Sequence, residues 1–210
     1  MIQKLKSILN DVWNTYSSPN RHYHNLDHIN ECLGLFNQYR DHVENPLEFA
    51  TAIIFHDYVY DIHSSTNEER SADCAVQITA PFFYRRSQDI IHDLIIATKH
   101  NKKGLSGDRA LIADIDLYRL SVPYEKFQKH SEQIRKEYET IPLTSYINGR
   151  IDFFKSLIDR RRIFQSDIFK TSEYYARSNI LRAIKEMENE QKTTRPLSSN
   201  RGNYPRNPIQ

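Results

Sequence analysis

The first segment whose residues could do chemistry reads RHYHNLDHINECL and covers residues 21–33. His24 and His28 are four residues apart, so on a helix they would share one face, with Arg21 one turn earlier. Two imidazoles and a guanidinium on one face can bind a metal ion or an anion. A solvated, histidine-rich helix start is the simpler alternative, and this segment alone does not exclude it.

The second segment, FATAIIFHDYVYD at residues 49–61, places His56 and Asp57 in strongly apolar surroundings. A buried, unpaired carboxylate loses several kcal/mol of hydration, and an ion pair or a divalent metal offsets that loss. The pair therefore indicates a metal site. The competing interpretation is a hydrogen bond between His56 and Asp57 at the end of a core helix.

A further carboxylate is available in ALIADIDLYRL, where Asp114 and Asp116 point about 200° apart on a helix. Both cannot face one site. Helical geometry barely favours Asp116, and we expect whichever aspartate is not a ligand to lie on the surface.

The elements that must position these residues are predicted to be helices. The chain has only five glycines, and its apolar residues recur at spacings of three and four. We expect an all-α bundle of about eight or nine helices in a single domain at residues 1–190, with a disordered tail at 191–210 that is rich in Pro, Ser, Asn and Arg. The first helix carries an apolar stripe from Ile2 to Tyr16. The third runs from Pro46 toward Tyr60 and contains His56 and Asp57, and Thr66 with Glu69 predicts a capping box for the fourth.

The overall charge gives no reason to expect a partner that binds through a strong electrostatic field. The 29 basic and 27 acidic residues give a net charge of +2, which carries no strong nucleic-acid or membrane signal. Cys32 and Cys74 lack CxxC spacing, and no window approaches the roughly 18 apolar residues of a membrane span. We expect a cytoplasmic protein with a small substrate, and a homo-oligomer is compatible with the sequence.

The order of these motifs, His28, then His56-Asp57, then a distant aspartate, resembles that of the HD superfamily. The chain is most similar to predicted bacterial metal-dependent phosphohydrolases with RxYHNxxHI, HDxxYD, NExxSA, TKH and DxDL segments. The resemblance covers most of the chain, and the matching stretches are Arg21–Ile29, His56–Asp61, Asn67–Ala72, Thr98–His100, Asp114–Leu117, RRRIF and YYARSNI. The YHNxxH string also resembles the metal-site segment of cyclic-nucleotide phosphodiesterases.

The resemblance implies a ligand set and a proton donor. The implied ligands of a divalent ion are His28, His56, Asp57 and Asp116, since the last ligand in related HD proteins is the aspartate that precedes a leucine. His24 is the implied general acid. Two His and two Asp suit Mn, Co, Ni, Mg, Zn or Fe and leave positions open for water and substrate, which is what metal-assisted hydrolysis requires.

Several further residues are candidates with ordinary alternatives. Arg21 and Lys99 are expected to hold phosphate oxygens, although solvated surface positions would explain them equally. By resemblance His100 is a second-metal ligand or a substrate contact, and Glu68 a catalytic residue that orients water or a ligand histidine. His130 has no partner pattern and is interpreted as solvated or structural.

The residues and the resemblance together predict a metal-dependent phosphohydrolase acting on a small phosphorylated molecule, and the expected substrate is a nucleotide or related phosphoester. Two alternatives stay open. Some HD-type scaffolds hold two irons and oxidise their substrates, and a catalytically silent HD domain could sense a nucleotide. Scaffold similarity does not choose between them.

Overall fold

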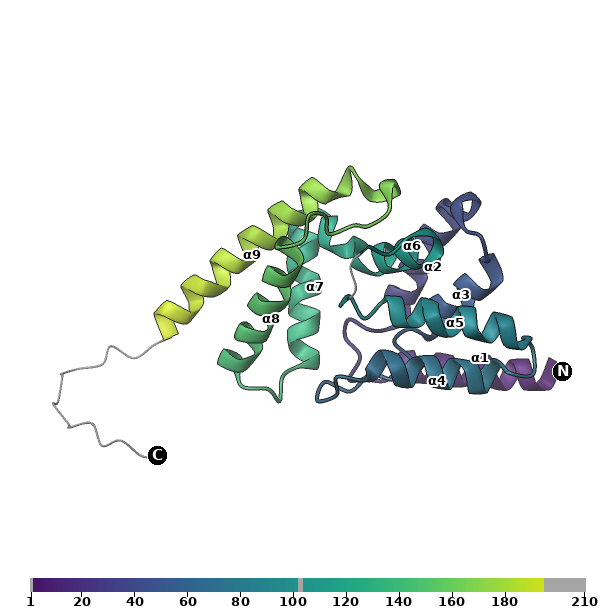
Figure 1. Ribbon diagram of the computed structural model, residues 1–210. Coiled ribbons are helices and arrows are strands. Elements are labelled where there is room, and N and C mark those ends of the chain that lie inside the picture. Colours follow the sequence, from purple (N-terminus) through teal and green to yellow (C-terminus); the bar gives the residue numbers. More distant parts are fainter. Residues whose placement is uncertain (1, 102–103, 195–210) are drawn as a thin grey trace, which may run out of the picture.

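The computed structural model describes residues 2–101 and 104–194, with side chains described as far as residue 192. Within these residues all regular secondary structure is helical and no strand is present, which confirms the all-α prediction (Figure 1). The elements are α1 (Ile2–Tyr16), α2 (Leu26–Gln38), η1 (Arg40–His42), α3 (Pro46–Phe55), α4 (Asn67–Thr79), α5 (Arg85–Ala97), α6 (Gly107–Leu117), η2 (Tyr118–Ser121), α7 (Tyr124–Glu137), α8 (Leu143–Ile158), η3 (Asp167–Phe169) and α9 (Ser172–Thr194).

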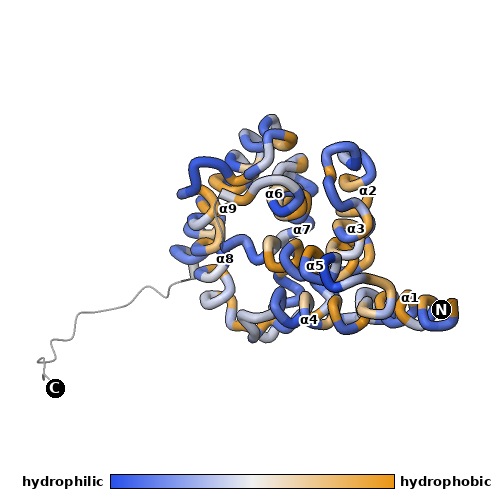
Figure 2. Tube along the Cα trace, turned by 45° about the vertical axis from the view of Figure 1, so that its right-hand side comes forward, coloured by the Kyte–Doolittle hydropathy of each residue, from blue (hydrophilic) through white to orange (hydrophobic). Residues whose placement is uncertain are grey.

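The helices form two groups that lie side by side in Figure 1, with α1 to α6 in one and α7 to α9 in the other. In the first group α5 packs against α3, α4 and α6, and its residues Ile91, Leu94 and Ile95 are fully buried. Figure 2 shows α5 between its neighbours with much of its tube coloured hydrophobic. In the second group α9 packs on α8 and on η2, so η2 joins the two groups.

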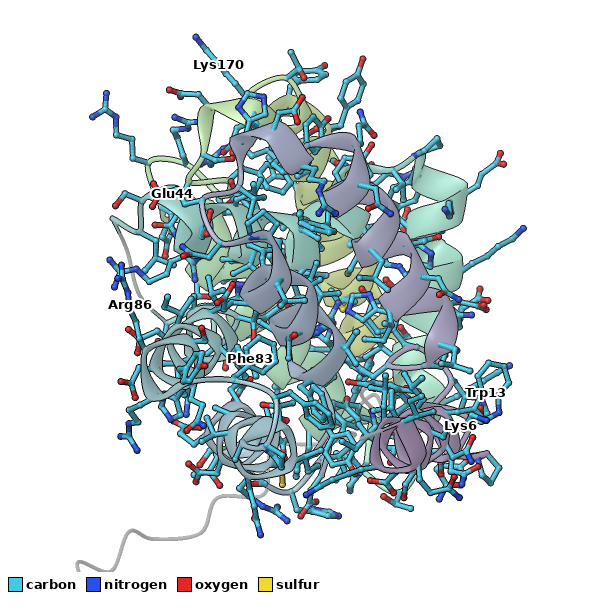
Figure 3. All side chains as sticks on the ribbon, turned by 90° about the vertical axis from the view of Figure 1, so that its right-hand side faces the viewer. Lys6, Trp13, Glu44, Phe83, Arg86 and Lys170 are labelled. Atoms are coloured by element: carbon cyan, nitrogen blue, oxygen red, sulfur yellow. The ribbon has the colours of Figure 1, made fainter. Side chains whose placement is uncertain are left out.

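Helix α1 buries much less of its apolar stripe than the sequence suggests. Only Val12 and Tyr16 are buried, whereas Leu5, Leu9 and Trp13 are exposed. Trp13 is 62% exposed and projects from the edge of the molecule (Figure 3). The last turn of α1 is therefore the part that anchors this helix to the core.

Two helix boundaries differ from the predicted ones, and both differences affect the candidate site. Asn25 Oδ1 accepts hydrogen bonds from the backbone N–H groups of Asp27 and His28, so α2 begins at Leu26 and His24 lies before it. Helix α3 ends at Phe55, which places His56 and Asp57 just beyond the helix rather than inside it. The Thr66 hydroxyl bonds to Ser64 Oγ at 3.1 Å, so the predicted capping box does not form.

The C-terminal helix continues farther than predicted. Helix α9 runs to Thr194, so the first four residues of the predicted tail are helical. The rest of that tail, residues 195–210, lies outside the described residues. No helix in the described ranges is both long enough and apolar enough to cross a lipid bilayer.

Asn179 ties the second helix group to η2, and its replacement tests that joint. Its buried Nδ2 donates to the carbonyl oxygens of Leu120 at 2.9 Å and Val122 at 2.7 Å. Asn179→Ala leaves both carbonyls without this donor, so we expect the free energy of unfolding in urea to fall by roughly 1–3 kcal/mol. Lys185→Ala, an exposed change on the same helix, should alter it by less than about 0.5 kcal/mol. Equal effects of the two variants would contradict the assigned role.

Candidate metal centre and adjoining cavity

Two histidines and two aspartates from three parts of the chain meet at one point. His28 comes from α2, His56 and Asp57 from the residues after α3, and Asp116 from α6. One ligand atom from each residue lies within 4.8 Å of all the others. His28 Nε2 is 3.1 Å from both His56 Nε2 and Asp116 Oδ1, and His56 Nε2 is 3.0 Å from Asp57 Oδ2. This His/Asp cluster brings together the four residues that the sequence predicts as ligands.

The hydrogen bonds around the cluster leave lone pairs pointing into it. His56 Nδ1 donates to the carbonyl oxygen of Ile53 at 2.8 Å, which leaves Nε2 as the atom that faces the other ligands. This backbone bond is the usual way in which a ligand histidine is oriented. Asp57 Oδ2 is buried 3.0 Å from His56 Nε2 and 3.6 Å from His28 Nε2, but it makes no hydrogen bond of good angular geometry with the described residues. A buried oxygen left in this state beside two imidazoles fits a divalent cation at the centre.

The electrostatics of the cluster favour a positive charge between its members. Burial alone would raise the pKa of Asp57 and Asp116, but the neighbouring histidines outweigh it and hold both pKa values below their ordinary range. Burial would likewise lower the pKa of His56, yet the two aspartates raise it well above its usual value. The pKa of His28 is lowered by burial. The two carboxylates thus stay ionised and attract a cation.

Asp114 does not face the cluster, and it is not a surface residue either. It is only 1% exposed, and its two carboxylate oxygens accept hydrogen bonds from the backbone N–H groups of Gln165 at 2.7 Å and Ser166 at 2.6 Å. Burial raises its pKa. The expectation of an ordinary surface aspartate was wrong, because Asp114 is buried and binds the backbone of the loop that follows α8. Asp116 lies on the opposite side of α6 and reaches the cluster.

His24 is held at the edge of the cluster by a residue that the sequence did not single out. Its Nδ1 lies 2.6 Å from Glu137 Oε2, and Glu137 Oε1 accepts from the backbone N–H groups of Tyr23 and His24. The ring of His24 also packs on that of Tyr60, with centroids 4.1 Å apart. Because Nδ1 is bound to Glu137, Nε2 is the atom left to exchange a proton.

Glu137 was missed because it belongs to none of the recognised motifs and lies 113 positions from His24. It sits at the end of α7 in a run of charged residues, KEYE, which reads as a solvated helix end. Its burial beside His24 appears only once α7 is placed against the segment before α2.

Arg21 has a different place from the phosphate contact that was expected. Its guanidinium donates to the backbone carbonyls of His24 at 3.1 Å, Asp57 at 2.6 Å and Tyr58 at 2.8 Å. It does not line the cavity beside the cluster. Arg21 therefore holds the segment before α2 against the residues after α3, and in this way positions His24 and Asp57.

Lys99, His100 and Glu68 do line that cavity. Lys99 Nζ is already paired with Glu69 and donates to the carbonyl of Ser65 at 2.8 Å. His100 Nε2 lies 2.7 Å from Asp116 Oδ2, so it contacts a member of the His/Asp cluster directly. Glu68 is half-buried, which raises its pKa, and no hydrogen bond joins it to the cluster within the described chain.

The cavity has a volume of about 580 Å³ and lies between the two helix groups. Asp116, His24 and His100 form its wall at the cluster, and residues of η2, α7 and α8 form the far wall. His130 is part of that far wall and is only 8% exposed, which excludes the solvated position considered for it. The cavity is within the usual size range for a small-molecule site.

Comparison of the chain with protein-family models and with curated proteins finds no match.

Replacing Asp116 and Asp114 one at a time tests which of them is the metal ligand and which binds the loop backbone. Asp116→Asn removes one of two carboxylates from the cluster, so we expect Mn²⁺ or Zn²⁺ affinity to fall at least tenfold in isothermal titration calorimetry. Asp114→Asn should retain the metal but lower the free energy of unfolding by about 1–3 kcal/mol, because the amide accepts only one of the two backbone bonds. Metal loss from the Asp114 variant alone would reverse the assignment.

The ion pair of Glu137 predicts how stability depends on pH. Burial would raise the pKa of Glu137, but the hydrogen bonds from His24 and the backbone lower it below the ordinary value of 4.5. A carboxyl with a lowered pKa in the folded state stabilises the protein above about pH 4.5, and this contribution is lost as the pH falls through the lowered value. With a chelator present, the stability difference between the protein and Glu137→Gln should therefore be largest at pH 7 and shrink toward pH 3 in urea titrations.

Glu139→Gln provides the control for this pH series. Glu139 is exposed and lies two residues farther along the chain. Its replacement should give a difference that is small at every pH. A stability difference for Glu137→Gln that stays constant from pH 7 to pH 3 would contradict the ion pair.

Proposed function

We propose that the protein is a metal-dependent phosphohydrolase of the HD type. The proposal rests mainly on one observation: the ligand atoms of His28, His56, Asp57 and Asp116 lie within 4.8 Å of one another at the wall of a cavity. The order of these residues in the sequence, which resembles the HD superfamily, supports the same conclusion. The proposed substrate is a small phosphorylated molecule, and the proposed location is the cytoplasm.

The donor set fits a divalent ion that keeps open coordination positions. Two imidazole nitrogens and two carboxylate oxygens suit Mn, Co, Ni, Mg, Zn or Fe. When bound, such an ion supplies Lewis-acid activation of water and of a phosphoryl oxygen. His56, oriented by Ile53, and Asp57, oriented through the backbone bond of Arg21, would hold the ion together with His28 and Asp116.

His24 is the proposed proton donor to the leaving oxygen. Its Nδ1 is bound to Glu137, so Nε2 can carry the proton and deliver it into the cavity that His24 lines. Glu137 is the proposed positioning residue, because its carboxylate binds Nδ1 and fixes the orientation of the ring. Lys99 and His100, on the same cavity wall, would contact the phosphate or a bridging water.

The contact between His100 and Asp116 favours one other candidate. At 2.7 Å from Asp116 Oδ2, His100 could join a second metal ion, and a pair of irons would permit oxygen chemistry in place of hydrolysis. Metal analysis together with oxygen uptake distinguishes the two. A hydrolase releases phosphate without consuming oxygen, and an oxygenase requires iron and consumes oxygen.

The direct test is a screen of phosphorylated metabolites against the purified protein with Mn, Co, Ni, Mg and Zn in parallel. Metal-dependent release of phosphate from at least one compound, abolished by Asp57→Ala, is the expected result. Asp57→Ala should lose the metal together with the activity, because one carboxylate fewer weakens the site. Turnover that survives both chelation and Asp57→Ala would exclude the proposed chemistry.

The proposed proton donor is tested by how the loss of activity depends on the leaving group. His24→Ala should keep the metal and lower kcat by about a hundredfold to ten-thousandfold on an alkyl phosphate, because general acid catalysis contributes on that order. On an activated aryl phosphate, whose leaving group needs no proton, the loss should be much smaller. Glu137→Gln should show the same dependence on the leaving group, with a smaller loss.

A partly exposed histidine outside the cavity supplies the control for this comparison. His92→Ala, on the outer face of α5, should leave the kinetics on both substrates unchanged. If His24→Ala slows the two substrates equally, or if it empties the metal site, His24 is not the acid.

A further inference from the structure

Beside the His/Asp cluster and beyond it the cavity is lined by flat rings, two of which, Tyr23 and Tyr60, lie against His28 and His24. Tyr23, Tyr60, Phe127, Tyr146 and Phe153 all contribute to its wall, and Ile134 and Leu120 add further apolar surface. Aromatic side chains at such a density are suited to stacking on a planar ligand group. A phosphate ester with a purely polar remainder would leave these rings unused.

A buried arginine provides directed hydrogen-bond donors in the same wall. Arg119 on η2 donates through Nε to Glu31 Oε2 at 2.7 Å, and its guanidinium lies over the ring of Tyr23 at 4.7 Å. No other hydrogen bond of this guanidinium forms among the described residues. Since Arg carries five N–H donors and no acceptor, most of its donors remain for a ligand that presents acceptors.

A second guanidinium lines the cavity from α8. That of Arg150 lies over the rings of Phe154 at 4.4 Å and Phe153 at 5.3 Å, and no ion pair of Arg150 forms within the described ranges. These contacts with two rings use no N–H group of Arg150, so its N–H groups can donate to a ligand in the cavity.

His130 adds a polar group that lacks a partner. Its ring lines the cavity beside Tyr23, it is 8% exposed, and its Nδ1 is buried with no hydrogen-bond partner in the described chain. Burial and the charge of Arg119 lower the pKa of His130 to about 4, so the ring is neutral near pH 7. Buried polar atoms without a partner are uncommon and mark places where a ligand or a water completes the hydrogen bonding.

We propose that this region is a nucleobase subsite, in which a base with carbonyl acceptors stacks among the aromatic rings and accepts hydrogen bonds from Arg119 and Arg150, with His130 beside it. This inference rests on the proposed hydrolase function only for the position of the phosphate, at the His/Asp cluster. Arginine pairs with the O6 and N7 acceptors of an oxopurine, whereas adenine presents an N–H₂ donor at that edge. The subsite therefore favours oxo bases over amino bases.

The charge of the wall argues against a second phosphate in this place. Arg119 is paired with Glu31, which also pairs with Lys126 outside the cavity, and His130 is uncharged at neutral pH, so Arg150 is the one cation without an ion pair that the described residues place at this far wall. A phosphate group would also have to lie among several aromatic rings, where its desolvation is costly. A neutral, flat ring with carbonyl oxygens meets both the donors and the apolar surface.

The test uses nucleosides, which lack the phosphate, so that binding does not depend on the metal or on turnover. Inosine and adenosine, which differ in the base at the 6-position, are titrated into the full-length protein by calorimetry. We expect inosine to bind about tenfold more tightly than adenosine. Arg150→Gln and Arg119→Lys should reduce that preference to less than about threefold, and Lys155→Gln, on α8 outside the cavity, should retain it.

The outcomes separate this inference from the proposed function. Three results would overturn the subsite, even if aryl phosphates are hydrolysed in a metal-dependent manner. Inosine and adenosine could bind equally, neither could bind at millimolar concentration, or Arg150→Gln and Arg119→Lys could keep the same preference as Lys155→Gln. A preference for inosine in a protein that hydrolyses nothing would uphold the subsite and reject the hydrolase. Arg150 is only half-buried, so Arg150→Gln tests the proposal if Arg119→Lys fails to fold.

Discussion

The structure depends on two carboxylates and two imidazoles that share one small, buried space. Asp57 and Asp116 are ionised there in spite of their burial, and a positive charge must lie among them to offset the lost hydration. A proton on His56 can supply that charge, and so can a metal ion, which also satisfies Asp57 Oδ2. The positions of α2, α3 and α6 follow from this requirement, because each must bring its ligand to the same point.

Charged side chains hold the loops around this point by binding backbone groups. Arg21 donates to three carbonyls, Glu137 accepts from the N–H groups of residues 23 and 24, and Asp114 accepts from those of residues 165 and 166. Asp108 does the same for Glu44 and Asn45. Helices satisfy their own backbone groups, but the segments that carry His24, His56 and Asp57 lie outside helices and need partners from elsewhere. Buried charge in this protein therefore positions loops as well as ligands.

The sequence could predict the parts of the site that depend on local pattern, but not those that depend on contacts between distant residues. The all-α fold follows from apolar periodicity, and His56 and Asp57 stand out because polar groups in apolar surroundings need a partner. His28 stands out only through its spacing from His24, and its assignment as a ligand came from the resemblance. Asp116 could be chosen over Asp114 only by resemblance, since both lie at the edge of the apolar arc and both prove to be largely buried. Glu137 and Arg119 could not be predicted, because their partners are 113 and 88 positions away and no local spacing reports such contacts.

The remaining differences between the predicted and the observed site arise from where α2 begins and α3 ends. A cap at Asn25 and the early end of α3 at Phe55 release His24, His56 and Asp57 from helical geometry, so the four-residue spacing of His24 and His28 does not place them on one helix face. His24 instead turns toward α7, where Glu137 fixes it, while His28 turns into the cluster. Two histidines of one motif thus acquire different surroundings, one at the cavity wall and one fully buried. That difference is the physical basis for proposing His24 as the proton donor and His28 as a metal ligand.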